Sequence, residues 1–211
     1  MKTLHFFAIF LLFAAPFAEA ARLKDVVRIK GVRENVLVGY GLVVGLKGTG
    51  DSGAEVTGKA LLRMFNKMGF AIDSEVKSKN VASVVVTAKL PPFARAGSKV
   101  DVTVSSVGDA ASLEGGMLLV TPLRAGDQQI YAVAQGTVSL GTLADGGAKF
   151  QTAGRVAAGA IVEKELPGEF ASKKTLRLTL DDPDFTTAAR VARTINSELS
   201  GKYATPVDNA T

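Results

Sequence analysis

The sequence comprises 211 residues with 25 basic and 20 acidic side chains, a formal net charge of +5, one histidine and no cysteine. Disulfide bonds are therefore excluded, and once His5 is set aside, the chain lacks the usual ligands of zinc and copper and the histidine partner of most catalytic nucleophiles. The basic residues are dispersed, with Lys173-Lys174 as the longest run, which argues against a nucleic-acid interface. We expect no metal site, no cofactor and no catalytic residues of these kinds.

The N-terminal segment has the pattern of a cleavable signal peptide over residues 1–20. Lys2 precedes an apolar run at 6–15, and Ala18 and Ala20 occupy the small-residue positions of a cleavage site, so that the mature chain would begin at Ala21. The run is too short for a membrane span, which needs about 20 residues. We therefore expect export, loss of His5 with the signal, and no membrane insertion after cleavage.

Strands separated by glycine-rich turns dominate the pattern of the first part of the mature chain. We expect strands at 26–30, 36–46, 81–90, 100–104, 117–123 and 130–140. A loop at 48–53 leads into an amphipathic helix at about 55–68, whose end is marked by Gly69. The apolar face of this helix is formed by Leu61, Leu62, Phe65 and Met68.

The remainder of the chain predicts one more strand and one more helix. Alternating leucines indicate a strand at 176–180, and Asp184 is placed to cap an amphipathic helix at about 185–199. We expect a β-rich domain with one helix at 21–140, a flexible Gly/Ala-rich loop or crossing at 141–154, and an incomplete second domain at 155–211. The fold class is α+β, with mixed or antiparallel sheets.

The loop at 48–53 resembles known nucleotide-binding loops in its glycine spacing. Gly48, Gly50 and Gly53 match a dinucleotide-binding pattern with Asp73 about twenty residues further on, and 53–59 match a phosphate-binding loop. Ala60 nevertheless stands where the second pattern requires a serine or threonine for Mg²⁺. We interpret the segment as a flexible loop between a sheet and a helix.

Two serine motifs also lack a partner residue or motif that their chemistry requires. Ser52 lies in a stretch similar to a serine-protease nucleophile loop, but the mature chain has no histidine to activate it. Ser74 and Lys77 match the S-x-x-K pattern of penicillin-recognising enzymes, yet the K-T-G partner motif is missing from the sequence. Neither pattern predicts a catalytic site.

Basic residues recur at four-residue steps along the first predicted helix. Lys59, Arg63 and Lys67 would therefore share one helix face. Such a face is either an ordinary solvated surface or a charged docking surface for an acidic partner, and the sequence leaves both interpretations open.

Many short strings of the mature chain, taken in order, closely resemble the flagellar P-ring protein family. They include Val-Arg-Glu-Asn at 32–35, Leu-Val-Gly-Tyr-Gly-Leu-Val-Val-Gly-Leu at 37–46, Gly-Thr-Gly-Asp at 48–51, Pro-Pro-Phe-Ala-Arg at 91–95, Thr-Pro-Leu at 121–123 and Asp-Phe-Thr-Thr-Ala at 184–188. Members of the family usually continue past the position of Thr211, so the chain resembles an N-terminal portion or a truncated form.

The resemblance implies a structural subunit of the flagellar basal body rather than an enzyme. Such a protein would assemble with copies of itself into a periplasmic ring around the rod, close to peptidoglycan, and act with the L-ring protein as a bushing for motility. Two other interpretations remain: a periplasmic factor outside the ring that binds or remodels peptidoglycan, and a nucleotide-binding protein that uses the loop at 48–53.

Overall fold

The computed structural model describes residues 22–72, 76–141, 150–166 and 173–211. The predicted signal peptide, including Ala18, Ala20 and Ala21, lies outside these residues, as do Asp73 and Ser74. The chain divides into two compact units, which we call the barrel unit (Arg33–Ala171) and the small unit (Met1–Val32 with Ser172–Thr211). In the described part of the chain, no helix has the length and apolar character needed to cross a membrane.

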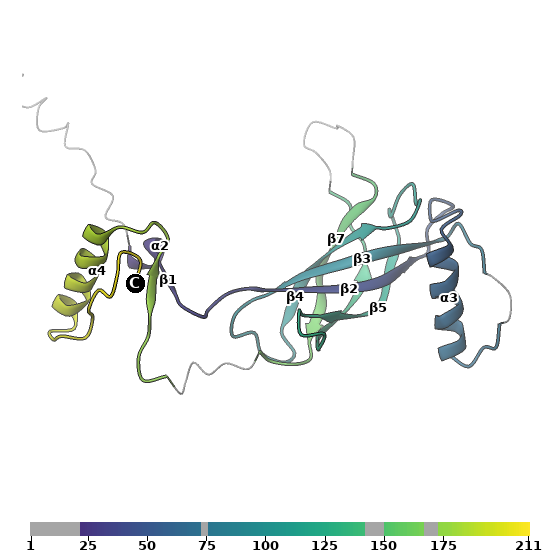
Figure 1. Cartoon of the computed structure of the whole chain (residues 1–211). Helices are drawn as coiled ribbons and strands as arrows, with labels where there is room; N and C mark the ends of the chain where they lie inside the picture. Colours follow the sequence, from purple (N-terminus) through teal and green to yellow (C-terminus); the bar gives the residue numbers. More distant parts are fainter. Residues whose placement is uncertain (1–21, 73–75, 142–149, 167–172) are drawn as a thin grey trace, which may run out of the picture. The chain divides into compact units, whose positions relative to one another are not determined.

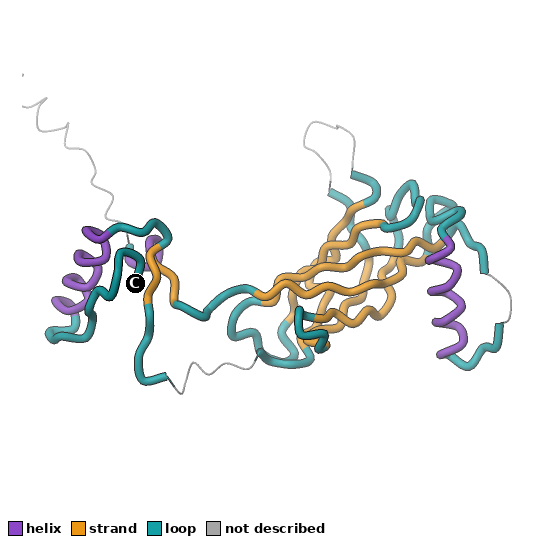
Figure 2. The backbone as a smooth tube through the Cα atoms, in the orientation of Figure 1, coloured by secondary structure: helices purple, strands orange, loops and turns teal. Residues whose placement is uncertain are grey.

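The barrel unit is a closed antiparallel barrel with strand order β2-β3-β4-β7-β6-β5 (Figures 1 and 2). Its strands are β2 (Asn35–Val44), β3 (Val81–Leu90), β4 (Lys99–Ser106), β5 (Met117–Arg124), β6 (Ile130–Thr137) and β7 (Ala153–Val162). Helix α3 (Glu55–Lys67) connects β2 to β3. The predicted α+β class is confirmed, and closure of the barrel removes exposed strand edges.

Alternation along the strands fills the barrel with small and branched side chains. In β4, Val100, Val102 and Val104 are buried, whereas the residues between them face outward, as the sequence predicts. The enclosed core also contains Leu37, Val84, Val86, Leu90, Leu118 and Leu123. Outside the barrel, α3 covers a second, smaller apolar cluster around Leu42, Leu61 and Val81.

Strand β7 was not predicted from the sequence, and it changes the domain boundaries. It pairs with both β4 and β6 and so closes the barrel, whereas the expected division at 141–154 would separate β7 from those partners. Residues 142–149 lie outside the described part of the chain. Because strand pairing is non-local, the compact barrel unit extends to Ala171 instead of ending near residue 140.

A β-bulge interrupts the pairing of β7 with β4. Val100 pairs with Ala160 and Val102 with Val156, so that three residues of β7 lie opposite Asp101. The Asp101 carboxylate accepts a hydrogen bond from the Ala158 backbone N–H at 2.6 Å and is also bonded to Arg155. Asp101 thus fixes the conformation of the bulge, in which Ala158 has a φ of +48°.

Replacing Ala158 by glycine is expected to raise the free energy of unfolding by about 0.5–1 kcal/mol, because glycine adopts a positive φ without the steric cost that a Cβ atom imposes. Ala157→Gly is the matched control, since Ala157 is also exposed but lies outside the positive-φ region. Urea unfolding of both variants measures the difference. A loss of stability in Ala158→Gly would contradict the prediction.

The small unit contains α2 (Leu23–Val26), β1 (Val27–Ile29), β8 (Leu178–Leu180) and α4 (Phe185–Glu198). β1 and β8 form a two-stranded antiparallel sheet. Asp184 caps α4 as predicted, because its carboxylate accepts a hydrogen bond from the Thr187 N–H at 2.6 Å. The C-terminal tail returns from α4 to β8, where the Leu180 N–H donates to the Ala210 carbonyl at 2.7 Å (Figure 1).

Candidate functional site

The loop at 48–53 is held against the barrel through its own backbone amides. The Gly48 N–H donates to the Asn80 side-chain oxygen at 3.0 Å, the Gly50 N–H to the Lys79 carbonyl at 2.7 Å and the Asp51 N–H to the Val81 carbonyl at 2.8 Å. A phosphate-binding loop needs such amides to point at the ligand. These amides already have protein acceptors, and the glycine at position 50 allows close packing of the loop on the backbone of Lys79 and Val81.

Asp51 is the buried centre of this loop, with only 4% of its surface exposed. Its Oδ2 accepts hydrogen bonds from the Ser83 backbone N–H at 2.8 Å, from the Ser83 hydroxyl at 3.1 Å and from the Thr57 hydroxyl. Gly108 packs directly against the carboxylate, where a Cβ atom would overlap with it. Asp51 therefore joins the loop, the first turn of α3 and β3, and sequence reasoning did not identify it.

Asp109 organises the other side of the same loop. It accepts hydrogen bonds from the Ser52 hydroxyl at 2.6 Å, the Ser52 N–H at 3.1 Å and the Gly53 N–H at 3.1 Å. The bond from the Ser52 hydroxyl is the main reason why the pKa of Asp109 lies below its usual range. Ser52 is thus a donor within the loop, and no histidine lies among the described residues to make it a nucleophile.

Asp109→Asn is expected to destabilise the protein at neutral pH, and the difference from the original chain should shrink in acid. A folded-state pKa below the unfolded value of 3.8 means that the carboxylate stabilises the fold above that pH and loses this contribution as the pH falls further. Urea unfolding at pH values from about 7 down to 3 measures the difference. A difference that stayed constant over this range would contradict the prediction.

The three basic residues predicted on one helix face are indeed exposed together on α3. Lys59, Arg63 and Lys67 lie on its solvent side, while Leu61 is buried on the opposite side. Lys59 forms an ion pair with Glu55 one turn earlier, and the hydrogen bond from Lys59 lowers the pKa of the Glu55 carboxyl. Part of the predicted apolar face is exposed, since Met68 at the helix end is 55% accessible. A docking role for the basic face stays a prediction.

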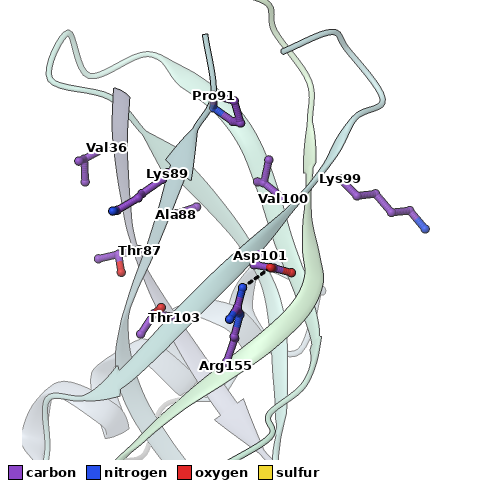
Figure 3. Close-up of a pocket in the computed structure, with 10 residues that line it drawn as sticks. All are labelled: Val36, Thr87, Ala88, Lys89, Pro91, Lys99, Val100, Asp101, Thr103 and Arg155. Atoms are coloured by element: carbon purple, nitrogen blue, oxygen red, sulfur yellow. Dashed lines mark hydrogen bonds and ion pairs between the residues drawn. The ribbon is translucent and has the colours of Figure 1, made fainter. Parts of the chain in front are cut away.

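A cavity of about 640 Å³ opens on the outer wall of the barrel, lined by residues of β2, β3, β4 and β7 (Figure 3). Asp101 and Arg155 point toward each other and form an ion pair, whereas Lys99 points away from the cavity. The Ala158 N–H, followed by Arg155, holds the pKa of Asp101 below its usual range. Asp101, the carboxylate among the described residues that line the cavity, is thus engaged in holding the bulge.

Potential metal ligands do not cluster among the described residues. Within residues 22–72, 76–141, 150–166 and 173–211, no group of three acidic, histidine or cysteine side chains is arranged to hold a metal ion. The polar groups of the loop bond to one another and to the barrel instead of converging on a substrate. Barrel, loop and helix together define a protein of the α+β class.

Comparison with known sequences identifies the family. The chain belongs to the flagellar P-ring protein family, which matches it over residues 22–211. It is 53% identical over 195 residues to the flagellar P-ring protein of Bdellovibrio bacteriovorus, covering 92% of this chain and 58% of that protein. The P-ring protein of Geotalea uraniireducens is 53% identical over 211 residues (96% and 57%), and that of Caulobacter vibrioides 51% over 200 residues (90% and 54%). The chain thus spans little more than half the length of these relatives.

Proposed function

We propose that this chain acts as a structural subunit, or part of one, of the flagellar basal-body P ring. In this proposal it is exported by its signal peptide, works in the periplasm and assembles with copies of itself around the flagellar rod. The L-ring protein is its neighbour toward the outer membrane, and peptidoglycan lies close by. The ring serves as a bushing for rotation, so the chain needs no catalytic residues and no cofactor.

The observation that carries the proposal is the match to the flagellar P-ring protein family from residue 22 to residue 211. The match includes both compact units, so it does not rest on the loop or the barrel alone. The internal hydrogen bonding of Asp51 and Asp109 supports a structural role for the most motif-like segment of the chain. A closed ring also requires two different, complementary faces on each subunit.

Deletion of the gene in the source bacterium tests the proposed function. Basal bodies isolated from the deletion strain should lack the P ring, and the cells should lose swimming motility. Reintroducing the gene should restore both. Basal bodies that keep a normal P ring and cells that swim normally would overturn the proposal.

The basic face of α3 is our candidate for contact with an acidic surface of the rod or the cell wall. Arg63→Glu combined with Lys67→Glu should strongly reduce swimming, because it reverses the charge of this face, while the melting temperature changes by less than about 2 °C. Lys59 is left in place because it is paired with Glu55.

Lys47→Glu combined with Lys99→Glu is the matched control, since it makes the same charge change at two exposed residues outside α3. The control cells should swim normally. Equal swimming of both double variants would favour the interpretation of the α3 face as an ordinary solvated surface.

A further inference from the structure

The small unit contains an apolar groove that its described residues leave open. A cavity of about 580 Å³ lies among β8, α4 and the C-terminal tail. Its apolar lining includes Leu176, Leu178, Val191, Ile195, Leu199 and Val207. Leu176 is 53% exposed and Leu199 is 59% exposed. Removing such side chains from water is favourable, so this groove favours an apolar occupant.

One edge of β8 beside this groove is only partly used. The Lys30 N–H donates to the Arg177 carbonyl at 2.8 Å, and the Asp181 N–H donates to the Val26 carbonyl at 3.1 Å. Arg177 and Asp181, which flank β8, therefore direct their backbone hydrogen-bonding groups toward β1. Successive residues of a strand direct their N–H and C=O groups to opposite edges, so Leu178 and Leu180 direct these groups to the edge away from β1. There the Leu180 N–H bonds to Ala210, but among the described residues no backbone group pairs with Leu178.

The charged side chains among the described residues that line this groove are basic. Over the described residues, the small unit carries ten basic and six acidic side chains and the larger barrel unit thirteen and nine, a net charge of +4 in each. Arg28 is neutralised by Asp181 at 2.7 Å. Lys174 and Arg177, in contrast, line the groove itself. An occupant of the groove should therefore be acidic as well as apolar.

We propose that the outer edge of β8 binds an extended, acidic segment of a partner polypeptide by strand addition. The partner backbone pairs with β8 at Leu178, its apolar side chains enter the groove toward α4, and its acidic side chains face Lys174 and Arg177. A third strand also gives the sheet the stability that two strands alone lack. The net positive charge of both units disfavours a second copy of this chain as the occupant. The inference does not depend on the proposed ring function.

Binding of a labelled model peptide tests the proposal. The probe is a blocked peptide that alternates valine and glutamate over about six positions, the usual length of a strand. Fluorescence anisotropy with the full chain should show saturable binding that weakens with added salt. Two control peptides should bind about tenfold more weakly: one with lysine in place of glutamate, and one in which every backbone amide is N-methylated, so that neither of its edges can donate to β8. Equal binding of either control, or failure of the probe to bind, would overturn the proposal.

Variants of the chain locate the site. Leu176→Asp, which places a negative charge at the groove, and the milder Leu199→Ser should each weaken binding of the probe about tenfold. Phe185→Asp is the matched control, because Phe185 is 72% exposed on α4 but does not line the groove, and it should bind as the original chain does. Circular dichroism confirms that each variant is folded. Unchanged binding by both groove variants, or self-association of the chain that the same variants abolish, would contradict the proposal.

Discussion

Replacing Gly50 by alanine is expected to lower the free energy of unfolding by about 3 kcal/mol, the upper range for overpacking a well-packed interior. A Cβ atom at this position would overlap with the Val81 carbonyl oxygen and would lie 2.7 Å from both the Lys79 carbonyl oxygen and the Val81 nitrogen. All three atoms belong to the backbone at the start of β3, so no side chain can rotate to relieve the overlap. Urea unfolding of the purified variant measures the loss.

Gly48→Ala in the same loop is the matched control for this effect. Gly48 has a φ of +77°, but no atom lies within 4 Å of the position that its Cβ would take. Only backbone strain of about 1–2 kcal/mol should therefore result. If Gly48→Ala cost as much stability as Gly50→Ala, close packing against β3 would not be the reason for glycine at position 50.

The glycine spacing of this loop illustrates what a sequence pattern can and cannot indicate. Close approach of a backbone to a phosphate and close approach of a backbone to a strand both require glycine. A glycine in such a pattern is therefore compatible with either case, and here Gly50 is the one that approaches a strand closely. What distinguishes the two cases is the destination of the amide hydrogen bonds, which here are the residues around the start of β3 and Asp109.

Local elements with strong periodicity were predictable from the sequence. The bounds of β3, α3 and α4 agree with the expected ranges to within about a residue at each end, and Asp184 caps α4 as predicted. The basic face of α3 also followed from four-residue spacing alone. The end of the strand expected at 130–140 was predicted wrongly: β6 ends at Thr137.

Features that depend on contacts between distant segments were not predictable. β7 contains the run Ala-Ala-Gly-Ala at 157–160, which has little strand propensity by itself and becomes a strand through pairing with β4 and β6. Barrel closure depends on the same pairing. Asp51 resembled any polar residue of a glycine-rich loop, because its partner Ser83 lies 32 residues further along the chain.

The importance of Asp51 leads to the second prediction with a large effect. Asp51→Ala should lower the free energy of unfolding by about 3–4 kcal/mol, because it leaves the buried Ser83 N–H without an acceptor and removes the acceptor of the Thr57 and Ser83 hydroxyls. Asp51→Asn should cost less, about 1–2 kcal/mol, since the amide oxygen can still accept these bonds at the position of Oδ2.

Amide hydrogen exchange and swimming assays together distinguish a structural role of Asp51 from a role in contacting a partner. If Asp51 joins the loop, α3 and β3, Asp51→Ala should speed hydrogen exchange of the amides in the first turn of α3 and at the start of β3, whereas amides of α4 in the small unit should be unaffected. Asp51→Asn, which keeps most of these bonds, should then retain swimming. A fully stable Asp51→Ala variant whose cells cannot swim would instead show that the carboxylate acts on a partner and not within the fold.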